Sequence, residues 1–237
     1  MIEIIGLILV SWLLIWLFQK EHLTVLGLDI SKEKINYSII LFTITAMCSL
    51  SSLVMRIFFA QEVFTINPKL NPYLISVEMW MTFKSVVFEE LLTRGVLLYI
   101  LIQRLGKTWA ILISSLFFGL LHLNNVTTQS GVVEILITFL YPFVFGLVMA
   151  YSYTKSFSIY LPFAIHFGWN IVENVIMPDS SSTNTLLIIQ EQPIVTVSYF
   201  VFVSMMLFPK ISAIISDYLI VRKIKKRSWS KQSLGQQ

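Results

Sequence analysis

The stretch VVFEELLTRGVLL, Val86–Leu98, places three charged side chains inside a run that is otherwise apolar enough to cross a membrane. These side chains are Glu89, Glu90 and Arg94. On insertion scales, an ionisable side chain at the centre of a bilayer costs at least ~2.5 to 3.5 kcal/mol. A cost of this size indicates that the charges have a function or compensate one another.

The composition around this stretch is that of a membrane protein. The 237 residues are 56% hydrophobic and 13% charged, whereas an average soluble domain is roughly 45 to 50% apolar and 25% charged. The apolar runs are too many and too evenly spread to form one soluble core. We therefore predict an all-α fold, a polytopic membrane helix bundle. The single cysteine, Cys48, excludes an intramolecular disulfide and a cysteine-based metal site.

About 20 apolar residues cross a bilayer, and on this basis the sequence predicts about seven transmembrane spans. They form a single domain over residues 1–221, with a catalytic core at about 73–177 and a basic tail over 222–237. The connections that follow the second and sixth spans are predicted to be loops. The predicted spans are 2–18, 38–59, 73–103, 108–123, 132–153, 157–177 and 194–208, with 211–221 as a continuation or an interfacial helix.

Basic residues predict the orientation of the chain. Six of the seventeen Lys and Arg residues fall in the last sixteen positions, which predicts contact of the tail with anionic lipid on the cytoplasmic side and no binding of nucleic acid. With the tail inside, the other Lys-rich and Arg-rich connections also fall inside. The sequence shows no eukaryotic targeting signal, which favours a bacterial cytoplasmic membrane with a cytoplasmic C-terminus.

Three predicted spans carry the unusual polar residues. Glu90 and Arg94 are four residues apart and share a helix face in the acid-first order that favours an ion pair. Glu89 points about 100° away from Glu90 and is the better candidate to face a cavity. On the fourth span His122 follows FFGLL, and on the sixth His166 and Asn170 share one face.

Counting from the predicted inner loops places these residues at similar depth. The separations are fourteen residues from Glu90 to Arg104, fifteen from Lys107 to His122 and fifteen from Lys155 to Asn170, each about 20 Å of helix. We therefore expect the three spans to bring them together. Any one histidine or asparagine alone could equally be a packing residue or an interhelical hydrogen bond, and site roles for Glu173 and Asn174 stay open.

These residues resemble, in chain order, three motifs of the CPBP family of CAAX prenyl proteases and bacteriocin-processing or self-immunity membrane proteins, also called Abi. Glu89–Arg94 is similar to EExxxR, Phe118–His122 to FxxxH and His166–Asn170 to the HxxxN/B motif. The position before the arginine is commonly aromatic in the family, whereas this sequence has Thr93.

The resemblance implies an intramembrane endopeptidase of the glutamate type. It implies that Glu89 is the general base, assisted by His122, that His166 and Asn170 form an oxyanion hole, and that Glu90 and Arg94 are a structural ion pair. The residue types suit this chemistry. A low-dielectric cavity disfavours a charged carboxylate and makes it a stronger base, and a fixed donor at a developing oxyanion is worth about 2.7 to 4 kcal/mol.

Several alternatives remain at this level. Glu89, His122 and His166 have the atoms of a three-ligand zinc site, but HExxH is absent and the resemblance implies no cofactor. A catalytically silent scaffold, a bacteriocin self-immunity or regulatory protein, and a small transporter are the other functional hypotheses, because intramembrane Glu and His also mark proton and ion pathways. The expected partners are membrane lipid and a membrane-associated peptide or protein C-terminus, prenylated or not.

Overall fold

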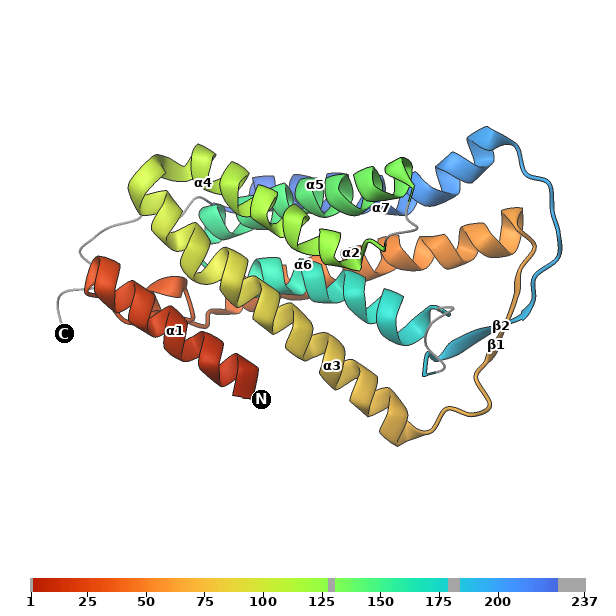
Figure 1. The fold of residues 1–237 in the computed structure, drawn as a ribbon, viewed down its shortest axis with the longest axis horizontal. Helices are drawn as coiled ribbons and strands as arrows, with labels where there is room; N and C mark the ends of the chain where they lie inside the picture. The colour runs from red at the N-terminus through yellow and green to blue at the C-terminus, as the bar shows by residue number, and fades with distance from the viewer. Residues whose placement is uncertain (1, 128–130, 179–183, 226–237) are drawn as a thin grey trace. The chain divides into compact units, whose positions relative to one another are not determined.

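A computed structural model describes residues 2–127, 131–178 and 184–225 (Figure 1). The chain is mostly helical and divides into two compact units. The first unit comprises Met1–Ser38, Val87–Phe163 and Tyr218–Gln237, and the second unit comprises Ile39–Val86 and Ala164–Asp217. Most of the predicted basic tail, residues 226–237, lies outside the described residues, as do 128–130 and 179–183 within two predicted loops.

The first unit is built from helices at the positions predicted for the first, fourth and fifth spans. The predicted third span is one helical backbone that passes through a π-helical segment, η2 (Leu91–Leu97), into the first part of α4. Short 3-10 turns, η1 (Leu23–Leu26) and η3 (Leu123–Asn125), follow two of the helices. The helices are α1 (Ile2–Gln19), α4 (Leu98–His122) and α5 (Val132–Ser156).

Gly106 turns the chain inside α4. Its φ of 77° and ψ of 169° are non-helical, and glycine adopts this conformation without the steric cost that a side chain would bring. Residues after Gly106 run back beside those before it (Figure 1). The turn therefore lies within residues 104–107, which connect the predicted third span (73–103) to the predicted fourth (108–123).

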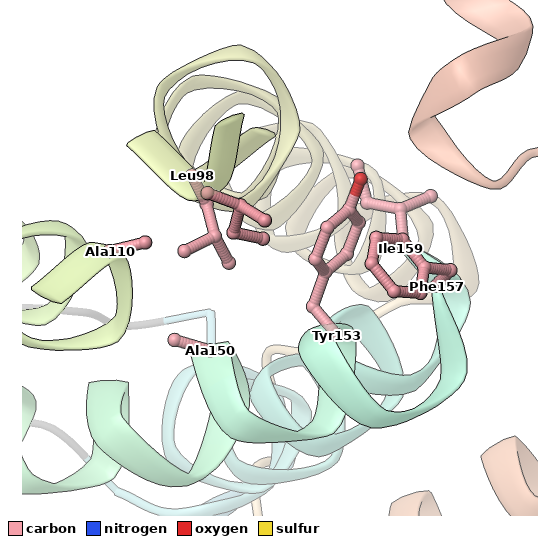
Figure 2. Packing of buried hydrophobic residues seen from close by; sticks show 7 residues of the cluster. Leu98, Ala110, Ala150, Tyr153, Phe157 and Ile159 are labelled. Atoms are coloured by element: carbon pink, nitrogen blue, oxygen red, sulfur yellow. The ribbon is translucent and has the colours of Figure 1, made fainter. Parts of the chain in front are cut away.

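The core of the first unit lies where α4 meets α5 (Figure 2). Ala110 on α4 and Ala150 on α5 are fully buried in it, and small residues let membrane helices approach closely. Tyr153, Phe157 and Leu98 fill the space beside them. A second cluster packs α1 and η1 against the helix that follows Glu90, through Ile15, Val25, Leu26, Val96 and Tyr99.

The second unit contains most of α2 (Lys32–Phe59) and α3 (Pro72–Glu90), together with α6 (Tyr160–Ile171), a second π-helical segment η4 (Val172–Ile176) and α7 (Tyr199–Lys223). Gly168 brings α6 against α2, because a Cβ atom there would lie 2.6 Å from the Phe42 carbonyl oxygen. The Phe167 ring packs between Phe42 and Phe83, with centroid distances of 5.9 and 6.0 Å.

Two connections that the sequence predicts to be loops contain strands, so that part of the prediction is wrong. β1 (Val63–Ile66) pairs antiparallel with β2 (Leu187–Glu191) in a two-stranded sheet. Each strand is too short to show a period of its own. Because lipid-exposed sheet edges do not occur within the hydrocarbon, the sheet indicates that the α2–α3 and α6–α7 connections emerge on the same side of the membrane.

The last helix, α7, begins at Tyr199, five residues later than the span predicted at 194–208. It continues through Pro209 to Lys223, which confirms the alternative that 211–221 is a continuation of this span. Proline removes one backbone donor, and neighbouring polar groups can satisfy the exposed carbonyls. The carbonyl that Pro209 leaves without its helical donor is that of Met205, and Lys210 Nζ donates to the next carbonyl oxygen, that of Met206, at 3.2 Å.

Among the described residues, three helices are long and apolar enough to cross a membrane: α2, α5 and α7. α1 has a shorter apolar stretch, Ile4–Phe18. Large apolar side chains such as Phe58, Leu136 and Ile215 are exposed on the three long helices, which suits contact with lipid. The count of about seven spans stays a prediction.

Candidate active site

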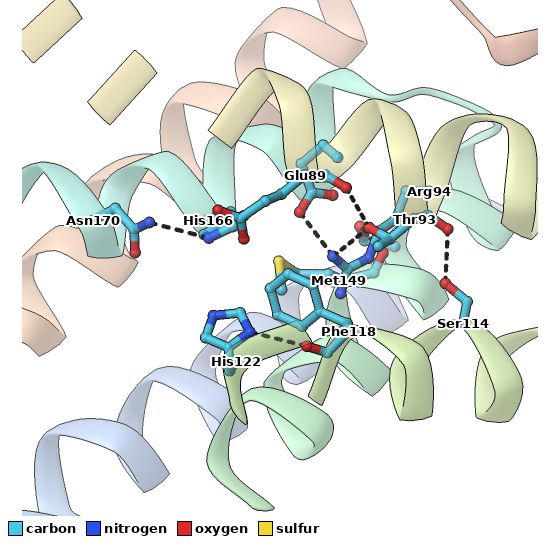
Figure 3. A network of polar contacts seen from close by, with 11 residues as sticks. Glu89, Thr93, Arg94, Ser114, Phe118, His122, Met149, His166 and Asn170 are labelled. Carbon is cyan, nitrogen blue, oxygen red and sulfur yellow. Dashed lines mark hydrogen bonds and ion pairs between the residues drawn. The ribbon is translucent and has the colours of Figure 1, made fainter. Parts of the chain in front are cut away.

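The deepest charges in the first unit form an ion pair. Arg94 is 0% exposed and Glu90 is 1% exposed, and Arg94 Nη1 donates to Glu90 Oε1 at 2.9 Å (Figure 3). The residues are four apart on the helix, as the sequence predicts. The two charges therefore compensate one another inside the core.

Thr93 holds this pair in place, although the sequence had marked it only as a departure from the family pattern. Arg94 Nη1 also donates to Thr93 Oγ1 at 2.8 Å, and the same hydroxyl donates to the Glu89 carbonyl oxygen at 2.6 Å. The Thr93 carbonyl oxygen accepts from Ser114 Oγ at 2.8 Å. The Thr93 hydroxyl thus links Glu89 and Arg94 through hydrogen bonds that a phenylalanine could not make, and the Thr93 backbone carbonyl links this turn to α4.

Phe118 connects the ion pair to His122. The Arg94 guanidinium lies over the Phe118 ring, 3.9 Å from its centroid, in a cation–π contact. The Phe118 and His122 rings meet edge to face, with centroids 4.6 Å apart. Residues of the EExxxR and FxxxH motifs are therefore in physical contact in the first unit (Figure 3).

Glu89 differs from Glu90 in exposure. Glu89 lies in the last turn of α3, immediately before the π-helical segment, and its side chain is half-buried. It interacts electrostatically with Arg94, which spacing alone did not predict. A carboxylate that is partly accessible and close to a fixed cation can accept a proton from a bound water.

His122 has a defined ring orientation. Its Nδ1 lies 2.9 Å from the Phe118 carbonyl oxygen, so this nitrogen carries the proton of the neutral ring and Nε2 carries the lone pair. The bond is within one turn of α4, which fixes the ring relative to the helix.

His166 and Asn170 form a pair in the second unit. Asn170 Nδ2 lies 3.1 Å from His166 Nε2, and His166 is 3% exposed. With the amide as donor, His166 accepts at Nε2 and carries its proton on Nδ1, and the amide keeps a second N–H. This second amide N–H of Asn170 can therefore serve as a donor.

The same helix changes geometry directly after this pair. η4 begins at Val172, and Glu173 within it accepts a hydrogen bond from Ser49 Oγ of α2 at 2.7 Å. Both π-helical segments thus lie next to motif residues, where such segments are frequently found. Apolar periodicity could not have revealed them, because a π turn uses the same residue types as an α turn.

The structure brings the candidate residues together in two sets. Glu89, Glu90, Arg94 and His122 belong to the first unit, and His166 and Asn170 belong to the second. No group of three or more His, Cys, Asp or Glu side chains within residues 2–127, 131–178 and 184–225 could hold a metal ion. The zinc site predicted from Glu89, His122 and His166 would need residues of both units, so it stays a prediction.

Residues 71–172 match a family model described as Rce1-like, type II CAAX prenyl endopeptidase. This region is Rce1-like. The match includes Glu89, His122, His166 and Asn170, and it supports the family resemblance that the three motifs carry. No curated protein and no solved structure matches the chain. The three long apolar helices indicate an integral membrane protein, and residues 71–172 are similar to type II CAAX prenyl endopeptidases.

Proposed function

We propose that this chain is an intramembrane endopeptidase that hydrolyses a peptide bond in a membrane-associated peptide or protein C-terminus. The observation that carries the proposal is the Rce1-like match, because the matched segment contains all four candidate catalytic residues. Prenylated tails and unmodified peptide precursors are both candidate substrates. The coupling of Arg94 to His122 through Phe118 supports the proposal, because it ties two motifs into one rigid cluster.

Glu89 is the proposed general base. It takes a proton from a water molecule whose oxygen then attacks the scissile carbonyl carbon, and His122 orients that water through the Nε2 lone pair. Glu90 is unsuited to this role because it is buried against Arg94. When the C–N bond breaks, the proton held by Glu89 passes to the departing amide nitrogen, which leaves as an amine.

His166 and Asn170 are the proposed oxyanion hole. The second N–H of the Asn170 amide is the proposed direct donor to the tetrahedral oxygen, and His166 holds that amide in place through Nε2. Their mutual hydrogen bond fixes them before the substrate arrives, and preorganised donors are the ones that lower a barrier. The reaction as written requires no cofactor.

We further propose a bacterial cytoplasmic membrane location with the C-terminus inside, and one bundle over 1–221 with its catalytic core at about 73–177. The pairing of β1 with β2 supports part of this topology, because it joins two connections that the orientation places outside. The proposed partners are lipid and the peptide substrate.

The test compares membrane peptides in cells that carry wild-type protein, Glu89→Ala or His122→Ala. We expect loss of cleavage in Glu89→Ala and a decrease of about 10²- to 10⁴-fold in His122→Ala, with unchanged protein abundance. Glu134→Ala, an exposed carboxylate at the start of α5, is the control and should cleave normally.

Two results would contradict the proposal. Wild-type cleavage by Glu89→Ala would remove Glu89 as the base. Identical peptide profiles in wild type and all variants would instead favour a silent scaffold, a self-immunity protein or a transporter. Loss of activity on chelation, with recovery on adding Zn²⁺, would favour the zinc alternative.

A further inference from the structure

A polar cavity within the second unit is not used by the proposed reaction. Its volume is about 580 Å³, which is within the roughly 300 to 1,000 Å³ typical of ligand sites. The cavity lies among α2, α3 and η4, and five of its nine lining residues lie outside the Rce1-like match. The polar and charged side chains that line it are Arg56, Glu78, Thr82, Ser85, Glu173 and Asn174.

The charges around the cavity favour a cation. Arg56 is already compensated, because its Nη2 lies 2.6 Å from Glu62 Oε2. Among the described residues, Glu78 has one partner, the neutral Asn184 amide at 3.1 Å. Glu173 accepts from the Ser49 hydroxyl and interacts electrostatically with Lys210 of α7. Glu78 therefore remains as an uncompensated negative charge on the wall.

Thr82 adds a hydroxyl to the lining of the cavity. The residue is 3% exposed and lines the cavity, and within the described residues its oxygen is not among the fully buried atoms that lack a partner. The hydroxyl is therefore open to the cavity and can exchange a hydrogen bond with an occupant.

The cavity residues follow the same helix faces as the candidate catalytic residues. Glu78, Thr82 and Ser85 precede Glu89 by eleven, seven and four residues, spacings that share one face of a helix. On α6 and η4, Glu173 follows Asn170 by three residues and His166 by seven. A substrate held at Asn170 would therefore extend along the face of α6 and η4 that carries Glu173.

Distances along these helices indicate which residues of a bound peptide would lie beside each carboxylate. At 1.5 Å per residue, Glu173 is about 4.5 Å from the level of Asn170, and Glu78 is about 16 Å from the level of Glu89. An extended peptide advances about 3.3 Å per residue. The two carboxylates thus correspond to about one and about five residues from the scissile bond.

We infer that this cavity binds a basic side chain of the peptide substrate, between one and five residues from the bond that is cut. This inference rests on the proposed function and adds a substrate preference to it. Because the two carboxylates lie at different levels, one ammonium or guanidinium group binds one of them. It binds Glu173 if its residue lies about one position from that bond and Glu78 if it lies about five, and Thr82 provides a further hydrogen bond.

The test measures binding to the full chain carrying Glu89→Gln, held in phosphatidylcholine nanodiscs. The probes are a synthetic apolar peptide with a single lysine and the same peptide with norleucine at that position. We expect the lysine peptide to bind about tenfold more tightly. The preference should disappear in a Glu78→Gln, Glu173→Gln variant and persist in Glu191→Gln, whose exposed carboxylate lies on β2.

Glutamine keeps the carbonyl oxygen that accepts from Asn184 or Ser49, so the variants retain those hydrogen bonds, and a thermal melt verifies their folding. Equal binding of the two peptides, or a preference that survives the double substitution, would overturn the inference. Displacement of the lysine peptide by phosphatidylethanolamine in the nanodisc would also overturn it, because the occupant would then be a lipid amine.

Cleavage by the wild-type chain separates this inference from the proposed function. If the lysine peptide binds with the expected preference but no peptide is cut, the cavity assignment stands and the endopeptidase proposal fails. If both peptides are cut with equal efficiency, the endopeptidase proposal stands and the cavity assignment fails.

Discussion

Arg94 is held by three neighbours of different chemistry. Glu90 supplies a carboxylate, Thr93 supplies a hydroxyl, and Phe118 supplies the face of an aromatic ring. Because Arg94 is fully buried, each neighbour replaces part of the hydration that the guanidinium has lost. Removing one of these neighbours should therefore destabilise the protein more than removing one partner of a surface ion pair would.

Replacing Glu90 by alanine should destabilise the protein by about 3 to 5 kcal/mol, because Arg94 would remain as an uncompensated buried charge. The measurement is thermal unfolding of the purified protein in detergent. Adding Arg94→Leu to Glu90→Ala should restore much of the lost stability, since it removes the charge that the first substitution exposed. Wild-type stability of Glu90→Ala alone would contradict the ion pair.

Replacing Thr93 by valine should cost about 1 to 3 kcal/mol, because Arg94 and the Glu89 carbonyl lose a buried hydrogen-bond partner. Thr93→Ser keeps the hydroxyl and is the matched control. The two variants are compared by unfolding temperature. If they unfold together, the hydroxyl has no role in holding Arg94.

Sequence reasoning could predict the pairing of Glu90 with Arg94, because a spacing of four residues on a helix defines it. It could not predict the role of Thr93. The Thr93 hydroxyl binds both a side chain of the next residue and a carbonyl one turn earlier, and neither bond follows from hydrophobic periodicity. The same holds for the contact of Arg94 with Phe118, which joins two segments distant in the sequence.

Apolar runs in the sequence predicted the positions of most helices. They did not predict where each helix ends, the two strands or the π-helical segments, because these depend on local interactions. α7 passes through Pro209, although a proline usually ends or kinks a helix. β1 and β2 have only four and five residues, and neither alternates in burial. The π-helical segments leave no trace in composition.

Gly146 of α5 provides the space into which Arg94 and Phe118 pack. A Cβ atom at this position would lie 3.1 Å from Arg94 Nη2 and 3.3 Å from Phe118 Cδ1. Gly146→Ala should therefore displace both groups and destabilise the protein by about 1 to 3 kcal/mol.

The control for Gly146 is Gly131→Ala, at the start of the same helix, where a Cβ atom would meet nothing within 4 Å. Both variants are compared with wild type by thermal unfolding, and the proposed cleavage activity provides a second measurement. Equal unfolding temperatures for the two variants would show that α5 can move aside at no cost.

For the whole molecule, the composition was sufficient to predict a membrane protein, because an apolar fraction this high cannot be buried in one soluble domain. The number of spans was harder to predict. A span count needs the end of every apolar run, and helices such as α3 carry several charged residues among their apolar ones. The division into two units could not be read from the sequence, since each unit combines segments far apart in the chain.

Cysteine labelling tests the proposed orientation. In a Cys48→Ala background, Thr127→Cys should react with a membrane-impermeant maleimide in intact cells, because the loop after α4 is proposed to lie outside. Lys225→Cys should react only after the membrane is permeabilised. Labelling of the cysteine-free protein measures the background. If Lys225→Cys reacts in intact cells and Thr127→Cys reacts only after permeabilisation, the orientation is the reverse of the one proposed.

The small sheet has a consequence for the order of folding. Val63 in β1 pairs with Glu191 in β2, more than one hundred residues later, so the first strand leaves the ribosome long before its partner exists. Closing so long a loop carries an entropic cost that local contacts do not. The sheet should therefore form after the intervening helices have entered the membrane, as the step that ties the early and late halves of the second unit together.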